Sequence, residues 1–113
     1  SGLAGFYSAL LAGKLIGPEL FKEFTKEHSN NFDRSLLRPM RYGLGCMLEP
    51  AVNSDGIYCM AQSAFGHVGM GGPISFGDAE RDISFAFVTN TMGGHVLSDP
   101  RIQKLSKAVY ASL

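Results

Sequence analysis

Four glycines occupy the seven positions from Gly66 to Gly72, in a stretch that reads Phe-Gly-His-Val-Gly-Met-Gly-Gly from Phe65. Because glycine has no Cβ, such a density of glycines indicates a backbone that bends sharply or passes close to another group. A tight connection between strands and a backbone that a ligand approaches both fit this pattern. A nucleotide-binding loop does not fit, since GxGxxG would need Gly where Ile74 stands and a P-loop would need Gly-Lys followed by Ser or Thr.

The residues after this stretch predict an antiparallel hairpin. Ile74 and Phe76 alternate with Ser and Gly, and a second alternating run extends from Ile83 to Val88. Apolar residues with a period of two are typical of strands. Residues 78–82 between the runs are polar and turn-like, which favours a direct connection. We interpret the acidic residues there as a charged turn rather than as paired catalytic carboxylates: Asp78, Glu80 and Asp82.

Three helices are predicted. Apolar residues recur at helical spacing over residues 3–11, with Ser1 placed to cap the start and Gly13 placed to end the helix. Residues 17–19, Gly-Pro-Glu, begin a second short helix, because Pro is tolerated at the first helical position. Residues 98–100, Ser-Asp-Pro, begin the last helix, which we expect to lie on the sheet. Its apolar stripe is Ile102, Leu105, Val109 and Leu113.

The remaining segments complete the predicted fold. Residues 28–39 are polar and read as a surface loop, residues 41–48 alternate as a strand, residues 49–56 form a turn-rich connection, and residues 57–60 form a short extended piece. The predicted order is helix, helix, strand, hairpin, helix. The fold class is α+β, a single domain over residues 1–113 with an antiparallel sheet and helices packed on it.

Composition and charge limit which partners and cofactors we expect this chain to bind. Ten Lys and Arg balance ten Asp and Glu without runs of either sign, so neither nucleic acid nor an acidic membrane is an expected partner. No apolar stretch reaches the ~20 residues that span a bilayer, which predicts a soluble chain. Cys46 and Cys59 lack the spacing of a zinc site and are expected to be reduced, buried thiols, with a disulfide between them as the alternative. No metal or cofactor is predicted.

Residues 66–72 resemble a motif of the penicillin-recognising serine hydrolases, the β-lactamase and esterase superfamily. A Lys-Thr-Gly triplet on an inner strand borders the active site in that family, and in many relatives His replaces Lys to give Gly-His-x-Gly-x-Gly-Gly. Other matching features follow in family order: a helix at residues 3–10, Gly-Leu-Gly at 43–45, a Phe-Gly-Asp turn at 76–78 and a strand at 85–90. The resemblance runs along essentially the whole chain. It implies a partial β-lactamase/transpeptidase-like fold that corresponds to the C-terminal part of such a domain.

The resemblance implies roles for three residues. The N–H of Met70, just after the triplet, would donate to the oxyanion that forms when a Ser nucleophile attacks a carbonyl group. His67 would be a polar or cationic wall facing the carboxylate or leaving group, and imidazoles ordinarily titrate near neutrality, where lysine does not. Gly69 would let the substrate lie against the strand. For His67, the alternative is a core histidine that is bonded to the backbone.

The nucleophile of that family lies in Ser-x-x-Lys, whose Lys helps to activate the Ser. No Ser of the 113 residues has Lys three positions later, and the two that have Arg there are Ser35 and Ser98. Arg cannot serve as the base. Residues 110–112, Tyr-Ala-Ser, fit the letters of the family's Tyr-x-Ser element but follow the triplet, so we interpret them as chance. We therefore expect a C-terminal fragment, inactive by itself, of a hydrolase of esters, amides or β-lactams, with both elements upstream of Ser1.

A non-catalytic module that self-associates and binds peptide, acyl groups or a partner is the alternative. A sheet that lacks its usual neighbours exposes an open edge or apolar surface, so a homo-oligomer is expected for the isolated chain. The resemblance favours the cytoplasm or the mitochondrion without settling the compartment. His28 and His95 are interpreted as surface residues. The methionines are expected to fill gaps in the core rather than bind metal: Met40, Met47, Met60, Met70 and Met92.

Overall fold

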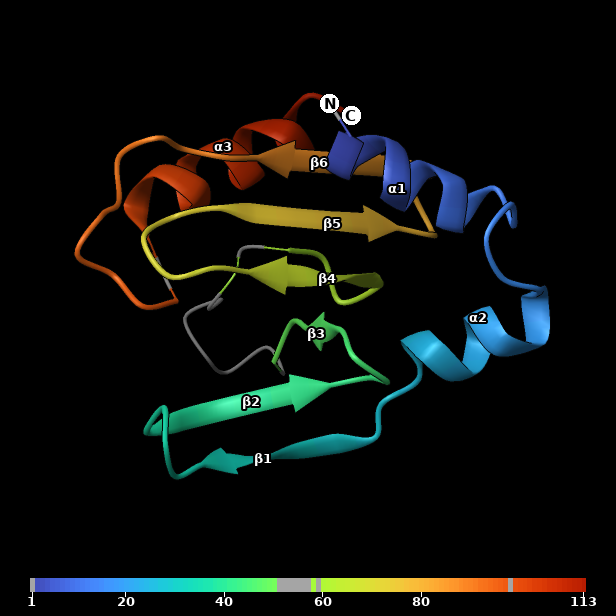
Figure 1. Ribbon diagram of the computed structural model, residues 1–113, viewed down its shortest axis with the longest axis horizontal. Helices are drawn as coiled ribbons and strands as arrows, with labels where there is room; N and C mark the ends of the chain where they lie inside the picture. Colours follow the sequence, from blue (N-terminus) through green and yellow to red (C-terminus); the bar gives the residue numbers. More distant parts are fainter. Residues whose placement is uncertain (1, 51–57, 59, 98) are drawn as a thin grey trace.

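The computed structural model describes residues 2–50, 58, 60–97 and 99–113. Figure 1 shows one sheet in which the strands lie side by side in chain order, from β1 to β6. Every neighbouring pair is antiparallel. The elements are α1 (Gly2–Leu11), α2 (Pro18–Thr25), β1 (Ser29–Asp33), β2 (Arg38–Tyr42), β3 (Met47–Leu48), β4 (Ala64–Val68), β5 (Ile74–Asp78), β6 (Ile83–Phe87) and α3 (Pro100–Ala111). The predicted α+β class with an antiparallel sheet is confirmed.

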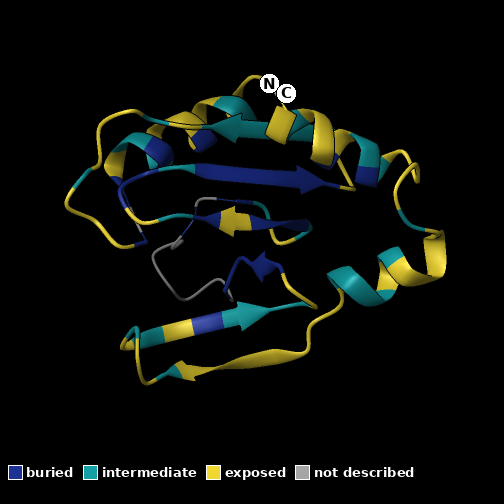
Figure 2. Cartoon of the chain, viewed as in Figure 1, coloured by how far each residue is buried: buried dark blue, intermediate teal, exposed yellow. Residues whose placement is uncertain are grey.

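Two hydrophobic cores lie on the two faces of this sheet, because side chains alternate along each strand. One core joins the sheet to α3 and contains Phe76 and Ile102. The other joins the sheet to α1 and α2 and contains Phe65, Tyr7 and Leu10. β5 is buried along its whole length, whereas β1 at the edge is mostly exposed (Figure 2). The helices therefore cover the β4 to β6 half of the sheet more completely than the β1 half.

The end of α1 and the start of α2 lie where the sequence predicts. Gly13 follows α1 with a positive φ of 66°, and its N–H donates to the Leu10 carbonyl at 3.1 Å. A left-handed residue at this position ends a helix, and glycine adopts it without steric cost. Gly17 is the N-cap of α2 and Pro18 is its first residue. Ser1, the predicted cap of α1, lies outside the described residues.

The prediction of a surface loop over residues 28–39 is wrong. Residues 29–33 and 38–42 pair as the hairpin β1–β2, with Ser29 opposite Tyr42 and Asp33 opposite Arg38. The Asp33 carboxylate closes the turn by accepting from two backbone N–H groups at 2.8 Å. β1 forms the edge of the sheet and has a single apolar residue, Phe32, so no alternation of apolar residues marks it.

The prediction of a single strand at residues 41–48 is also wrong, because the structure has two strands there with a turn between them. β2 ends at Tyr42 and β3 begins at Met47, and between them the Gly43 N–H donates to the Cys46 carbonyl at 2.9 Å. Gly45 has a φ of 77°, which an extended strand does not allow. The predicted element order therefore lacks the β1–β2 hairpin, the break before β3 and the strand β4. Of the predicted connection 49–56 and extended piece 57–60, residues 51–57 and 59 lie outside the described residues.

The last helix packs on the sheet as predicted, but its buried side is different. Leu105 and Leu113 are 37% and 67% exposed, so the predicted stripe is wrong at these positions. The contacts come instead from positions four residues apart, Ile102, Ser106 and Tyr110. The Tyr110 ring stacks on Phe76 with centroids 5.8 Å apart. A polar Ser inside the buried face hides this periodicity from an apolar-stripe search.

Asp78 holds the hairpin turn, in agreement with the interpretation as a charged turn: its fully buried carboxylate accepts from the Glu80 and Arg81 N–H groups. The prediction for the methionines needs correction. Met70 and Met92 are 63% and 65% exposed and do not fill gaps, whereas the methionines that do lie in the core are Met40, Met47 and Met60.

Cys46 is free and buried as predicted, and burial raises the pKa of its thiol. Cys59 lies outside the described residues. His28 and His95 are exposed, as the sequence predicts. Among the described helices, none is both long and apolar enough to cross a bilayer.

Candidate active site

The Gly-rich stretch forms β4 and the turn that joins it to β5. β4 is an inner strand, paired with β3 on one side and β5 on the other. Phe65 and His67 face the side of α1 and α2, whereas Gly66 and Val68 face the side of α3. Gly66 lets β5 approach closely, since a Cβ there would lie 2.6 Å from the Cβ of Phe76. His67, the first of the predicted site residues, therefore lies on an inner strand, on the face that α1 covers.

β3 covers only part of the edge of β4. Its two residues pair with Phe65 and Gly66, so Val68 extends past the end of β3. Hydrogen-bonded and non-bonded pairs alternate along an antiparallel ladder. The Gly69 N–H donates to the Pro73 carbonyl of the β5 side at 2.9 Å. Val68, one residue earlier, therefore turns its backbone groups away from β5 and toward this open edge.

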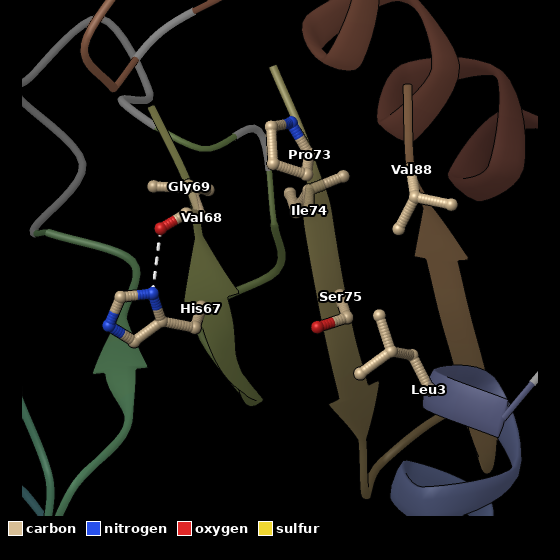
Figure 3. Close-up of a pocket in the computed structure, with 8 residues that line it drawn as sticks. All are labelled: Leu3, His67, Val68, Gly69, Pro73, Ile74, Ser75 and Val88. Atoms are coloured by element: carbon tan, nitrogen blue, oxygen red, sulfur yellow. Dashed lines mark hydrogen bonds between the residues drawn. The ribbon is translucent and has the colours of Figure 1, made fainter. Parts of the chain in front are cut away.

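His67 is exposed and lies at this open end of β4. Its Nδ1 is 2.6 Å from the Val68 carbonyl oxygen (Figure 3). Because a carbonyl oxygen only accepts, Nδ1 is the protonated nitrogen, and Nε2 of the neutral ring remains an acceptor. The alternative of a core histidine is wrong, although the predicted type of bond to the backbone is present.

A pocket of about 160 Å³ lies beside His67, between α1 and the strands β4, β5 and β6. Figure 3 shows Ser75 and Leu3 on this side, with the His67 ring directed away from Ser75. Burial raises the pKa of Tyr7, and a hydrogen bond with Ser75 offsets part of this rise, so the phenol stays neutral. The other lining residues are mainly apolar: Val68, Gly69, Pro73, Ile74 and Val88.

The turn after β4 determines where the Met70 N–H points. The Gly69 carbonyl accepts from the Gly72 N–H at 3.4 Å, and Gly71, at the third position of this turn, has a φ of 88°. A positive φ at that position is the signature of a type II turn and favours glycine. The C=O and N–H of one trans peptide point in opposite directions. Since the Gly69 carbonyl points into the turn, the Met70 N–H points out of it, and it has no hydrogen-bond partner among the described residues.

The turn is held from the other side by an ion pair at the start of α3. Asp99 is the N-cap of α3, accepts from the Arg101 N–H at 2.9 Å and lies 2.8 Å from Nη2 of Arg101. These hydrogen bonds hold the pKa of Asp99 at about 2. A Cβ on Gly72, whose φ is 115°, would lie 2.7 Å from Arg101 Nη2. The last glycine of the motif thus makes room for this ion pair.

Gly69 has a comparable structural reason to be glycine. A Cβ there would lie 2.7 Å from Cγ of Pro73 across the turn. The predicted role of Gly69, clearance for a substrate, remains a prediction. His67, Gly69 and Met70 lie together at one end of β4 and in the turn that follows it.

Other candidate groups lie elsewhere. Tyr110 packs against Phe76 in the α3 core, on the opposite face of the sheet from His67, which agrees with a chance match to the Tyr-x-Ser element. Ser35 lies in the β1–β2 turn, and Ser98 lies outside the described residues. Within the described part of the chain, no three His, Cys, Asp or Glu side chains are grouped as metal ligands.

Sequence reasoning missed two residues of the site. Ser75 lies directly opposite His67 in the β4–β5 register, and the strand alternation that placed Ile74 and Phe76 on one face already placed Ser75 on the other. Arg101 was considered only as the Arg of a failed Ser-x-x-Lys match. No local pattern connects it to a turn that lies 30 residues earlier.

Proteins of known sequence resemble this chain along most of its length. Residues 1–108 match the protein family described as Beta-lactamase. The chain is 32% identical over 97 residues to the esterase/beta-lactamase LipL of Mycobacterium tuberculosis, an alignment that covers 80% of this chain and 21% of that protein.

Solved structures agree in fold. A penicillin-binding protein homologue from Caulobacter crescentus superposes with a TM-score of 0.86 at 35% identity, covering 98% of this chain and 31% of that one. A family VIII carboxylesterase gives 0.82 at 28% identity, covering 99% and 31%. EstA from Arthrobacter nitroguajacolicus, at 24% identity and a TM-score of 0.80, shares the fold. The chain therefore spans less than a third of the length of these relatives.

Proposed function

This chain belongs to the beta-lactamase family, and on that premise we propose that it forms the oxyanion-binding wall of a β-lactamase-like serine hydrolase. The predicted partial β-lactamase-like fold is confirmed by the superposition on relatives of this kind. Acyl transfer places negative charge on a carbonyl oxygen, and preorganised N–H groups stabilise that charge. The proposed wall is β4 together with its turn.

The observation that carries this proposal is the orientation of the Met70 N–H. It points out of the turn, and none of the described residues accepts from it. An unsatisfied donor whose peptide plane is held in place is the geometry that an oxyanion requires. Because β3 ends before Val68, the edge beside this N–H is open to a substrate.

His67 is proposed to act on the leaving group. Nε2 is the free acceptor of the neutral imidazole, because Nδ1 is bonded to the Val68 carbonyl. An imidazole in this position accepts a hydrogen bond or a proton and returns the proton to the departing oxygen. A Lys in the same place would remain a point charge.

The nucleophile is proposed to come from outside these 113 residues. No Ser of the sequence has Lys three positions later. The Ser that lines the pocket, Ser75, is buried, and the His67 ring is directed away from it (Figure 3). In the complete site a serine oxygen would bond to the acyl carbon and the leaving oxygen would depart with a proton. Water would then release the acid.

Esters are the proposed substrate class. Among the described residues, no Lys, Arg, Asp or Glu side chain lines the pocket, which is formed largely by Leu3, Pro73, Ile74 and Val88. Such a surface suits a short apolar acyl group. LipL and the family VIII carboxylesterase, two relatives of this chain, are named as esterases.

The first test uses the purified chain with a chromogenic short-chain ester and a chromogenic cephalosporin. We expect no turnover, and no acyl adduct by mass spectrometry, because the nucleophile is absent. Turnover that His67→Ala abolishes, together with an adduct on a Ser of this chain, would show that the nucleophile lies within these residues.

The second test supplies the missing elements. Residues 1–113 replace the matching third of the family VIII carboxylesterase, whose fold they share. In this chimera His67→Ala is expected to lower kcat for the ester by about 10²-fold or more, as general acid–base groups ordinarily contribute. His28→Ala, an exposed histidine before β1, is the matched control and should leave kcat unchanged. Equal effects of the two substitutions would contradict the role of His67.

A further inference from the structure

Gly71 is the most heavily bonded residue of the turn that carries Met70. Its carbonyl accepts from the Gly93 N–H at 2.8 Å and from Arg101 Nη2 at 2.8 Å. Its own N–H donates to the His95 carbonyl at 3.0 Å. Both sides of Gly71 are therefore attached to residues that follow β6 in the chain, and the turn cannot rotate without breaking these bonds.

The Arg101 side chain joins several segments in this attachment. Its guanidinium donates to the carbonyls of Gly71 and Thr91, and Nε donates to Asp99 at 3.0 Å. A planar guanidinium presents its donors in a fixed fork, so it links these segments in one geometry. Lysine has a single ammonium on a flexible stem and cannot reproduce this arrangement.

Asp99 determines where this fork lies. Its carboxylate is 3% exposed and accepts from Nε and Nη2 of Arg101 through its two oxygens. Glycines surround it, because a Cβ on Gly93 or Gly72 would collide with Asp99 or Arg101. The end of the Gly-rich motif is thus shaped around this pair.

We propose that Arg101, oriented by Asp99, is a positioning residue that holds the Met70 N–H in the direction of an oxyanion. This inference rests on the proposed function, since it explains what holds in place the N–H donor that the function requires. The path is short: Arg101 holds the Gly71 carbonyl, Gly71 holds the turn, and the turn holds the peptide between Gly69 and Met70. Arg101 itself does not touch the substrate pocket.

A matched control exists at the other end of β5. Arg81 pairs with the fully buried Asp78 at 3.0 Å, and its side chain is 43% exposed, compared with 40% for Arg101. Both pairs join a half-exposed guanidinium to a buried carboxylate at a turn. Arg81 contacts Ser63 and the Tyr110 ring, which lie away from the Met70 turn.

The experiment compares Arg101→Lys with Arg81→Lys. In the full 113-residue chain, amide hydrogen exchange by NMR should show the Gly71 and Gly93 amides exchanging about tenfold faster or more in Arg101→Lys, because opening of the turn exposes them. In the carboxylesterase chimera, Arg101→Lys should lower kcat by about 10- to 10³-fold with little change in KM, which is the signature of a lost oxyanion donor. Arg81→Lys should change neither quantity.

The outcomes separate this inference from the proposed function. Unchanged exchange at Gly71 in Arg101→Lys, or equal losses of kcat in both arginine variants, would overturn the positioning role. Met70→Pro removes the N–H itself. If Met70→Pro leaves kcat unchanged, the oxyanion role of Met70 fails whatever Arg101 does. If Met70→Pro lowers kcat and Arg101→Lys does not, the proposed function stands and the inference about Arg101 falls.

Discussion

Asp99 combines two structural roles in one side chain. It caps α3 through the Arg101 N–H and pairs with the Arg101 guanidinium, while only 3% of its surface is exposed. Asparagine also caps helices well, so the substitution Asp99→Asn removes the negative charge and keeps the N-cap. This makes the electrostatic part of the interaction accessible to measurement.

The stability of the chain should depend on the ionisation of Asp99. Its pKa of about 2 in the folded protein is below the ordinary value of about 3.9 for an unfolded chain. The ionised form therefore stabilises the fold fully above about pH 4, and this contribution is lost as the pH falls toward about 2. We expect Asp99→Asn to be less stable than wild type at neutral pH, with the difference shrinking between these values. Urea unfolding at a series of pH values measures it, and a constant difference down to pH 2 would contradict the prediction.

Asp78 shows how burial and hydrogen bonding compete at one residue. Burial raises its pKa, whereas hydrogen bonds from Ser63, Arg81 and the Glu80 N–H lower it, and the net result lies below the usual value. The Ser63 Oγ donor is 2.8 Å away. A buried carboxylate held by several donors remains ionised, so the hairpin turn keeps its charge and its geometry.

At the scale of elements, Phe65 links α1 and α2 to the sheet. It is fully buried, and its ring contacts Tyr7 of α1 and the two phenylalanines of α2, Phe21 and Phe24, with centroids 5.3 to 5.8 Å apart. α3 packs on the opposite face through a different core. The two layers of helix therefore depend on different side chains of the same sheet.

Phe65→Ala should destabilise the chain by about 3–5 kcal/mol, because it leaves a large cavity in a core with few other members. Phe32→Ala, on the exposed edge strand β1, should change the free energy of unfolding by no more than about 0.5 kcal/mol. Urea unfolding gives both values. Hydrogen exchange should rise in α1 and α2 before it rises in α3. Uniform acceleration through all three helices would mean that the two cores do not open separately.

At the scale of the whole molecule, the two edges of the sheet differ. Four of the five residues of β1 are polar and one of them, Asp33, is acidic, whereas residues 83–92, which include β6, carry no charge. A hollow of about 520 Å³ lies at the β6 edge, lined by the start of α1 and by Ala86, Phe87 and Val88. Among the described residues, β5 is the one strand that pairs with β6. Natural proteins protect edges with charges and prolines, and β6 has neither.

We expect the isolated chain to self-associate through β6, because a second copy in antiparallel orientation would place no like charges opposite each other. Val88→Lys should suppress this association, since Val88 directly follows β6 and is 63% exposed. Phe32→Lys on β1 is the control and should leave it unchanged. Sedimentation velocity over a range of concentrations measures the association. A monomer at every concentration would contradict the expectation.

The sequence by itself determined the elements whose signals are local. Gly13 ends α1, Pro18 begins α2, Asp99 caps α3, and alternation over residues 74–88 specifies the β5–β6 hairpin. Each of these signals acts within a few residues, through a φ angle, a cap or a two-residue period. The motif from Gly66 to Gly72 also identified the family, because it is a continuous stretch.

Only the tertiary structure decided the features that join distant residues. β1 has no apolar alternation, and its position follows from pairing with β2 at the edge of the sheet. The buried side of α3 includes Ser106, which no hydrophobic pattern would select. Arg101 reaches Gly71 across 30 positions of the chain. Such contacts depend on how the elements pack in three dimensions, and the residues next to Arg101 in the sequence do not indicate them. Sequence reasoning therefore found the Gly-rich motif and missed the side chain that holds its turn in place.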